Sequence, residues 1–453
     1  MTDTLNAPDP ARLQDLAASL VKLAQDKGAD AAEAALAESR STELSVRDGQ
    51  LEDIERSESI DAGIRVFVGQ QQAGVGFSDL SAAGCEAAVE RAIAMARAAT
   101  EDPYTGLASP DQLVNQPPEL KLFDETLWGP AELEAHAIAV EQAARAIEGV
   151  TMTDSAFASQ GQGAAAHATS AGFNHGWRKS MFSYGASVIA EKDGAMERDY
   201  AATSARRPDM LRDLNEIGQE AGERTARRVG PQKMESGSYP VIFDRRIAAT
   251  FLSAFAGAIT GPAIARGVSF LRDKLDQPVF SDTVSIIDDP HRDWGHGSAP
   301  FDGEGLANQR SHLIEQGRLT GWLLNLSSAR QLGLPPTGHA RRAMGGPAGA
   351  GPTNIHLDAG PRSREDMITA IDDGVLLMEM FGPSLNSNTG DWSVGVSGYR
   401  IRKGVISEPV SEITVAGNLI DIFARLEPAS DLKFWGASNA PSLFVDALSV
   451  GGL

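Results

Sequence analysis

Two histidines and two carboxylates lie close together in one stretch of the sequence. His291, Asp293, His296 and Glu304 fall within 14 positions. Imidazole and carboxylate groups bind zinc and iron, and a carboxylate can also serve as a general base. Metal sites usually hold their ligands on a rigid element, whereas this stretch is interspersed with Gly and Pro. We therefore expect a solvated loop, and a metal site at these four residues is the alternative.

A second group of polar residues borders the Gly-rich segment 345–351. Arg341 and Arg342 precede it and could bind an anion or a peptide carboxylate. The segment lacks the Lys-Ser/Thr that follows the glycines of a phosphate loop, and Pro347 and Pro352 have no N–H to donate. We expect a flexible loop between strands rather than a nucleotide site.

Nucleophile motifs are missing from the sequence. It contains no G-x-S-x-G pattern, and its single cysteine, Cys85, lies in an Ala-rich stretch typical of a buried helix. One cysteine excludes a disulfide within the chain and a cysteine-based zinc cluster. It also suits a reducing compartment.

The elements that position these residues form two different halves. Residues 1–230 are predicted to contain one unit written twice, at about 11–100 and 130–230. Each unit has an amphipathic helix, a β-rich run with a hairpin signal, and a closing helix, which in the second unit is expected over 208–230. In the first unit we expect separate short strands that include 51–54 and 64–68. The hairpin signals are Asp48-Gly49 in the first unit and Asp193-Gly194 in the second.

Residues 231–453 are dominated by hairpins, with turns predicted at Gln316-Gly317 and Lys403-Gly404. Few helices are expected, at 244–260, 362–371 and 418–426. The first of these carries an apolar stripe at four-residue spacing, typical of a buried helix. The sequence thus predicts an α+β protein whose duplicated N-terminal domain precedes an antiparallel, barrel-like or sandwich-like C-terminal domain.

Composition excludes several classes of function. The 453 residues carry a net charge of −21, which argues against binding nucleic acid phosphates. The longest apolar stretch, 251–265, is shorter than the roughly 20 residues of a membrane-spanning helix. Met1–Pro10 lacks the basic and apolar regions of a secretory signal, so we expect a cytoplasmic protein.

Several segments, taken in order, resemble the TldD/PmbA family, and in particular its PmbA (TldE) branch. They cover nearly the whole chain and are found at 46–53, 63–69, 168–176, 301–305, 338–342, 352–354, 389–391, 409–419 and 441–451. The segments 338–342 and 352–354 contain Arg341, Arg342 and Asn354, which are therefore our candidates for substrate binding.

The resemblance implies a zinc peptidase that is assembled from two related chains and acts on unfolded proteins and peptides. Peptide maturation is among the activities that it implies. The TldD-type chain carries H-E-x-x-x-H on a helix and a late Cys ligand. In this sequence Ser253, Ala254 and Ala258 stand at the three motif positions, and the tail 431–436 has no Cys. None of these side chains can hold zinc or activate its water. No cofactor is therefore expected in this chain, and zinc is expected in a partner chain.

Three hypotheses follow. The first is a non-catalytic subunit that helps to hold extended peptides, paired with a TldD-like catalytic chain as a heterodimer or with itself as a homodimer. The second is an enzyme in its own right, with His291, Asp293 and His296 as metal ligands and Glu304 as base. The third is a stand-alone homodimer that binds peptides or acts like a gyrase modulator.

Overall fold

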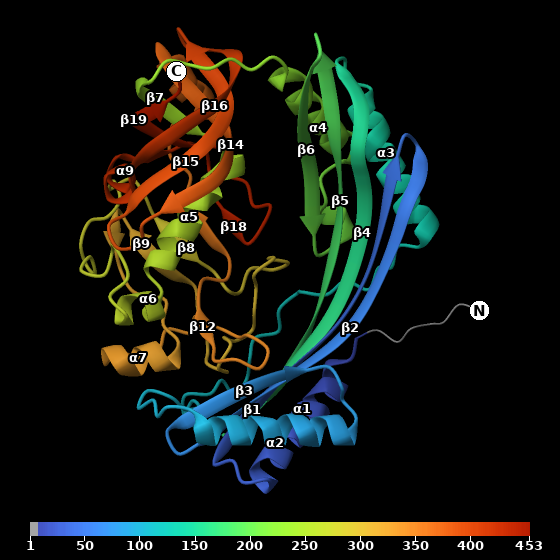
Figure 1. Cartoon of the computed structure of the whole chain (residues 1–453), viewed down its shortest axis with the longest axis vertical. Helices are drawn as coiled ribbons and strands as arrows, with labels where there is room; N and C mark the ends of the chain where they lie inside the picture. Colours follow the sequence, from blue (N-terminus) through green and yellow to red (C-terminus); the bar gives the residue numbers. More distant parts are fainter. Residues whose placement is uncertain (1–7) are drawn as a thin grey trace.

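The computed structural model describes residues 8–453 and consists of two lobes that face each other (Figure 1). The N-terminal lobe extends to helix α4 and the C-terminal lobe begins at strand β7. The first seven residues of the Met1–Pro10 stretch lie outside the described part of the chain. None of the helices in residues 8–453 combines the length and apolar character needed to cross a membrane.

One antiparallel sheet organises the N-terminal lobe. Its six strands run in the order β3-β2-β1-β4-β5-β6. The strands are β1 (Ala31–Arg47), β2 (Gln50–Val68), β3 (Gln71–Phe77), β4 (Val150–Thr169), β5 (Asn174–Lys192) and β6 (Ala195–Ala205). The β1–β2 and β5–β6 hairpins turn at Asp48-Gly49 and Asp193-Gly194, where all four residues have positive φ, as a tight I′ turn requires. Both hairpin predictions are confirmed.

The lobe repeats the order helix, three strands, helix. The first unit is enclosed by α1 (Pro10–Asp26) and α2 (Ala82–Ala98), and the second by α3 (Pro130–Arg145) and α4 (Leu214–Arg228), which follows the short 3-10 helix η1 (Pro208–Met210). The first strand of each unit, β1 and β4, pair antiparallel at the centre of the sheet. Duplicated units therefore share one sheet rather than forming two separate domains.

The two helix pairs cover opposite ends of the same sheet face. Ala34 and Leu36 of β1 belong to the core under α1 and α2, whereas Leu44 and Val46 belong to the core under α3 and α4. All four are even-numbered positions of the same strand, so their side chains lie on one side of it. The opposite face carries Glu33 and is turned toward the C-terminal lobe.

The connection 99–129 between the two units contains no helix or strand, and it packs against the C-terminal lobe. Val114 donates its N–H to the carbonyl of Gly305 at 3.0 Å. Arg330, in helix α7 (Leu326–Leu332), donates to three carbonyls of the connection at 2.7–3.1 Å. This segment therefore ties the lobes together although it has no regular structure.

A closed barrel forms the upper part of the C-terminal lobe. Its strands run in the order β16-β15-β14-β7-β19, and β19 pairs back with β16. They are β7 (Gly237–Phe243), β14 (Asp373–Leu385), β15 (Asp391–Arg402), β16 (Val405–Asn418) and β19 (Leu443–Gly451), with β17 (Glu427–Pro428) pairing on β19. Only β7 and β14 pair in parallel. The antiparallel barrel and the α+β class predicted from the sequence are confirmed.

A second, open sheet adjoins the barrel, in the order β10-β9-β8-β13-β18. Its strands are β8 (Ile286–Asp288), β9 (Ser311–Glu315), β10 (Arg318–Leu319), β13 (Ile355–Leu357) and β18 (Ser438–Asn439); β11 (Ala340–Arg341) and β12 (Gly349–Ala350) form a separate pair. The helices of this lobe are α5 (Arg245–Ala258), α6 (Gly261–Ala265), α7, α8 (Arg364–Thr369) and α9 (Leu419–Arg425). One apolar core joins the barrel, α5 and the open sheet.

Two details of the sequence prediction were wrong. The runs 51–54 and 64–68 belong to one 19-residue strand, β2, instead of two short ones. The helix expected over 208–230 starts only at Leu214, because Asp213 caps it by accepting the N–H groups of Asn215 and Glu216. The preceding residues form η1 and a short extended link.

Candidate functional site

Helix α5 presents its apolar side to the core and a side of small residues to the space between the lobes. Ile247, Phe251 and Phe255 are buried in the core. On the other side Ser253 is exposed, and its hydroxyl donates to the Ala249 carbonyl of its own helix at 3.3 Å. Figure 1 places α5 on the side of the C-terminal lobe that borders the gap.

The three positions at which the resemblance would place a zinc motif lie on this helix. Ser253 is exposed, Ala254 is partly buried and Ala258 is buried at 8% exposure. A serine hydroxyl already bonded within its helix and two methyl groups offer no set of zinc donors. The residues present at these positions do not fit a catalytic zinc ion.

The tail after β17 approaches the start of the same helix. Trp435 and Gly436 donate their N–H groups to the Asn439 side chain at 2.8 and 3.1 Å, which fixes the tail beside β18. The guanidinium of Arg245 lies 4.6 Å from the Trp435 ring centre. The structure therefore brings α5 and the tail together, although nothing in the tail could supply the late Cys ligand.

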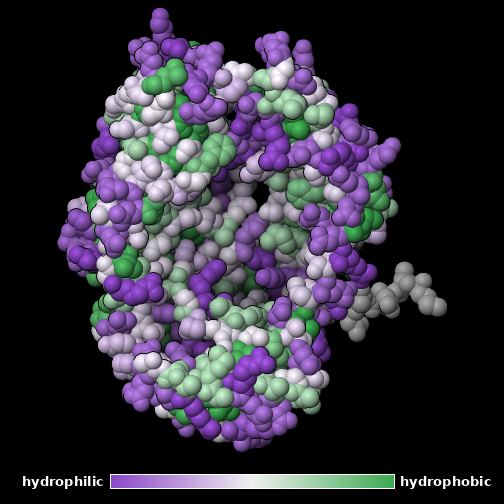
Figure 2. Space-filling view, viewed as in Figure 1, coloured by the Kyte–Doolittle hydropathy of each residue, from purple (hydrophilic) through white to green (hydrophobic). Residues whose placement is uncertain are grey.

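A cavity of about 240 Å³ lies where α5, the tail and the edge strand β6 meet. A neighbouring cavity of about 610 Å³ extends between α4 and the barrel. The two share four lining residues, Arg212, Glu220, Arg224 and Arg245. Figure 2 shows the surface hollowed between the lobes, with hydrophilic residues along the opening.

Ion pairs connect the lobes beside these cavities. Arg246 of α5 reaches Asp199 of β6 at 2.6 Å, and Arg228 of α4 reaches Glu379 of β14 at 2.6 Å. Burial alone would raise the pKa of Asp199, yet the hydrogen bond and charge of Arg246 hold that pKa below its usual value. Asp199 is therefore ionised at neutral pH and holds the lobes through Arg246.

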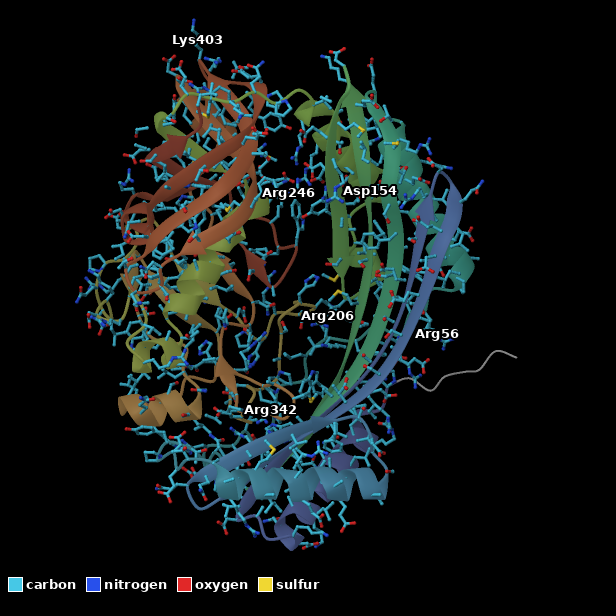
Figure 3. The ribbon with its side chains drawn as sticks, in the orientation of Figure 1. Arg56, Asp154, Arg206, Arg246, Arg342 and Lys403 are labelled. Carbon is cyan, nitrogen blue, oxygen red and sulfur yellow. The ribbon has the colours of Figure 1, made fainter. Side chains whose placement is uncertain are left out.

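Two further arginines cross the gap, and Figure 3 shows them with Arg246 between the lobes. Arg206 at the end of β6 donates to the carbonyls of Gly295 and His296 at 2.9 and 2.7 Å. Burial lowers the pKa of Arg206 to about 10, so it stays cationic at neutral pH. Arg342 extends from the C-terminal lobe to Glu33 of β1.

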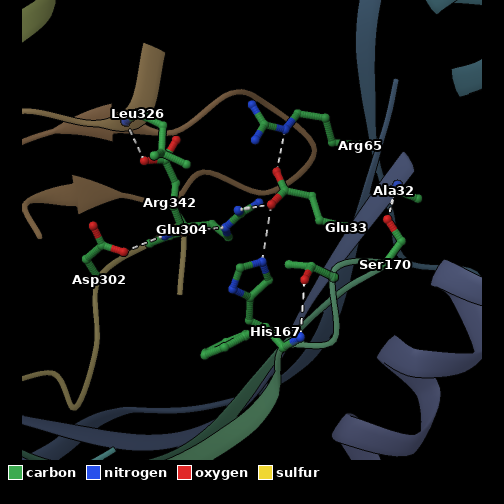
Figure 4. A network of polar contacts seen from close by, with 12 residues as sticks. Ala32, Glu33, Arg65, His167, Ser170, Asp302, Glu304, Leu326 and Arg342 are labelled. Atoms are coloured by element: carbon green, nitrogen blue, oxygen red, sulfur yellow. Dashed lines mark hydrogen bonds and ion pairs between the residues drawn. The ribbon is translucent and has the colours of Figure 1, made fainter. Parts of the chain in front are cut away.

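Glu33 is the centre of a buried polar network (Figure 4). It accepts hydrogen bonds from Arg65 and Arg342 and contacts His167 Nε2 at 3.3 Å. Burial alone would raise the pKa of Glu33, but the charges of Arg342 and Arg65 hold it well below its usual value. Burial and the nearby Arg342 lower the pKa of His167 to about 4, so its ring is neutral at pH 7.

Glu304 lies beside this network. Its carboxylate accepts the N–H of Leu326 at 2.7 Å and is 6% exposed. Burial and the neighbouring charge of Asp302 raise the pKa of Glu304 to about 7. Glu304 therefore holds the first residue of α7 in place instead of contacting a ligand.

The residues of the alternative metal site do not converge. His291 Nε2 contacts Asn308 at 2.7 Å, Asp293 pairs with Lys121 at 2.6 Å, and His296 contacts Ser204 at 3.2 Å. Among residues 8–453, no group of three or more His, Cys, Asp or Glu is placed to hold a metal ion.

The candidates for substrate binding have separate surroundings. Asn354 is 2% exposed, and its side chain binds the Gly297 N–H and the Asp289 carbonyl at 2.8 and 2.7 Å. Arg342 is engaged by Glu33, whereas Arg341 is exposed. Only Arg341 keeps a side chain available to a ligand, and substrate binding at the three remains a prediction.

Sequence reasoning missed the residues that border the cavities. Asp199 and Arg246 are 47 positions apart, and no local pattern links an edge strand to the start of a helix. The adjacent pair Arg245-Arg246 at the start of an apolar helix was the available signal. Two cationic side chains next to a buried apolar stripe need carboxylate partners or an anionic ligand nearby.

Three domain profiles of one family match the chain in order. Residues 32–96 match the PmbA/TldA metallopeptidase domain 1, 124–229 its central domain and 236–452 its C-terminal domain. The Metalloprotease PmbA of Escherichia coli O157:H7 is 33% identical over 97% of this chain and 96% of its own length. The Metalloprotease PmbA homolog of Haemophilus influenzae is 32% identical over 95% and 94%.

Solved structures share the fold over nearly the whole chain. A putative modulator of DNA gyrase from Bacteroides thetaiotaomicron has a TM-score of 0.89 and 26% identity, covering 97% of this chain and 99% of that one. TldE from Thermococcus kodakarensis has a TM-score of 0.85 and 19% identity, covering 96% and 100%. With ordered domain matches and full-length relatives above 30% identity, the chain belongs to the PmbA/TldD metallopeptidase family.

Proposed function

We propose that this chain is the non-catalytic subunit of a two-chain zinc metallopeptidase of the TldD/TldE type. The observation that carries the proposal is the chemistry of α5, where Ser253, Ala254 and Ala258 occupy the motif positions. The fold around this helix is that of the family, while the donors that zinc requires are missing from the helix and from the tail. The catalytic zinc would therefore be held by the partner chain.

The contribution of this subunit would be to complete a chamber and hold extended peptide segments. Two edge strands, β6 and β18, border the 240 Å³ cavity. An edge strand offers unpaired main-chain groups, and pairing through them tolerates any peptide sequence. Such pairing suits substrates that are unfolded proteins or peptides. Cytoplasmic location is part of this proposal, since the single Cys85 suits a reducing compartment.

The test is reconstitution with a TldD-like chain that carries H-E-x-x-x-H. Each chain is purified alone, its zinc content is measured by elemental mass spectrometry, and cleavage of an unfolded protein is followed for each chain and for the mixture. We expect substoichiometric zinc and no cleavage for this chain alone, and cleavage by the mixture well above that of the partner alone.

The matched variants are His296→Ala and His175→Ala, two partly buried histidines in this chain, of which only His296 belongs to the alternative metal site. Neither should change the activity of the mixture. Cleavage by this chain alone that is lost in His296→Ala and kept in His175→Ala would overturn the proposal. It would establish the alternative enzyme instead. Size measurement of the chain alone and of the mixture separates a homodimer from a heterodimer.

A further inference from the structure

The 240 Å³ cavity between the lobes is basic, although the protein as a whole is acidic. Its wall contains five cationic side chains and one carboxylate, that of Glu220. The cations come from both lobes: Arg212, Arg224, Arg245, Arg246 and Lys433. In a chain of net charge −21, such a concentration of positive charge in one cavity needs a local explanation.

Carboxylates inside the protein compensate only part of this charge. Arg246 is paired with Asp199 at 2.6 Å. Glu220 is shared by Arg212 and Arg224, two guanidiniums on one carboxylate. Arg224 is buried next to Arg246, and burial lowers the pKa of Arg224 although the charge of Glu220 opposes this shift; the charge of Arg246 adds to it. A cation whose charged form is disfavoured by its surroundings gains from an added anion.

Two of the cations have little or no ionic partner. Arg245 approaches Asp431 only at 4.0 Å and otherwise rests on the ring of Trp435. Lys433 is exposed, and among residues 8–453 no carboxylate lies within ion-pair distance of it. With Asp199, Asp431 and Glu379 counted beside Glu220, the five cations have four carboxylates within 4.0 Å. Glu379 is also shared with Arg228, which lies outside the cavity wall.

Trp435 adds a flat apolar wall between two charges. The guanidiniums of Arg212 and Arg245 lie 4.8 and 4.6 Å from its ring centre, one from each lobe. The indole is 37% exposed. An arginine stacked on an aromatic ring has its planar N–H fork held in place, and that fork matches a carboxylate.

We propose that this cavity binds a carboxylate group of a bound peptide. A volume of 240 Å³ is below that of most small-molecule sites and suits the end or one side chain of a longer ligand. The remainder would extend into the 610 Å³ cavity, which shares four wall residues, or along the edge strands β6 and β18. The inference deepens the proposed function and rests on it for the ligand being a peptide.

The experiment measures peptide binding by the purified chain alone, by isothermal titration calorimetry at low salt. The first probe pair is N-acetyl-tetra-alanine as free acid and as amide, which tests the terminal carboxylate. The second pair is N-acetyl-Ala-Ala-Ala-Glu-amide and its Gln counterpart, which tests a side-chain carboxylate. We expect one acid to bind at least about tenfold more tightly than its neutral counterpart, since charge-assisted hydrogen bonds are the strong ones.

Lys433→Gln is the main variant, because within residues 8–453 Lys433 has no ionic partner whose loss would disturb folding. Its affinity for the acid should fall about threefold to tenfold, and that of Arg245→Gln by about tenfold or more. Lys403→Gln is the matched control; it makes the same chemical change at the far tip of the C-terminal lobe (Figure 3) and should leave the affinity unchanged. Thermal melting verifies that each variant is folded.

The binding result and the reconstitution result are independent. Equal affinity of both acids and their neutral counterparts, or equal affinity of Lys433→Gln and Lys403→Gln, overturns the inference. Inorganic phosphate that displaces the acid peptide at or below the concentration of the peptide also overturns it, in favour of a free-anion site. Carboxylate-dependent binding without stimulation of the partner would leave the inference intact and refute the proposed function.

Discussion

Replacing Glu33 by glutamine removes the carboxylate that joins the N-terminal sheet to the C-terminal lobe. The side chain is 1% exposed and contacts Arg65, Arg342 and His167. Glutamine keeps the size and one acceptor oxygen, so the change is chiefly the loss of negative charge. The guanidiniums of Arg65 and Arg342, with side chains 6% and 15% exposed, would then remain buried without their counter-charge.

The expected effect is large. Removing one partner of a buried ion pair costs about 3–5 kcal/mol, because the remaining charge is left uncompensated. In a lobe of roughly 200 residues, 1 kcal/mol shifts the melting temperature by about 2–4 °C. Glu33→Gln should therefore lower the melting temperature of the N-terminal lobe by about 6–20 °C, measured by scanning calorimetry at pH 7.

Glu58→Gln is the matched control. Glu58 pairs with Arg56 at 3.1 Å on the same sheet, but its side chain is 45% exposed, so we expect less than about 1 kcal/mol. The pKa of Glu33 is held below its ordinary value of 4.5, so its stabilising contribution is present above about pH 4.5 and is lost as pH falls through the pKa of the folded state. The difference between wild type and Glu33→Gln should narrow below that pH. A melting temperature for Glu33→Gln within about 2 °C of that for Glu58→Gln would refute the reasoning.

Three other predictions follow from the packing around single residues. The pKa of Glu304 is raised from 4.5 to about 7 in the folded chain. Between pH 4.5 and pH 7 the folded chain therefore keeps a proton on Glu304 that the unfolded chain has released. The stability of the wild type should fall as pH rises through this range. Glu304→Gln should abolish that loss, which is on the order of 3 kcal/mol, as followed by urea unfolding at pH 5 and pH 8. Phe255→Ala, at a fully buried position of α5, should destabilise the C-terminal lobe by about 3–5 kcal/mol in the same assay; a loss below about 1 kcal/mol would contradict the packing described. Gly74→Ala would bring its methyl group into collision with the Gly345 carbonyl oxygen and should lower the melting temperature, whereas Gly76→Ala on the same strand meets nothing closer than 3.7 Å and should be tolerated.

Local signals in the sequence were sufficient for turns and for the helices with one apolar side. Asp48-Gly49 and Asp193-Gly194 have the residue types that a tight turn requires, and both turns form. The length of β2 was not predictable in this way. Its first ten residues are exposed, so the alternation of buried and exposed positions that identifies a half-buried strand is missing there. In this part of β2 the strand is defined only by its pairing with β1.

The site was less predictable than the fold. The apolar stripe of α5 and the missing zinc donors could be read from the sequence. The partner of Arg342 could not, because Glu33 lies 309 positions away and only the folded sheet brings it near. The basic character of the cavity likewise depends on bringing the adjacent pair Arg245-Arg246 together with Arg212, Arg224 and Lys433, which lie far from it in the sequence.

The pairing of β1 with β4 also determines how the chain can be divided. Their register runs from Glu33 with Thr169 to Val46 with Ala156. The apolar core under α1 and α2 includes residues of β4, and the core under α3 and α4 includes residues of β1. Each repeat thus completes the interior of the other. A protease cut in the connection 99–129 should give a nicked protein that stays in one piece, and neither repeat expressed alone should form a stable fold.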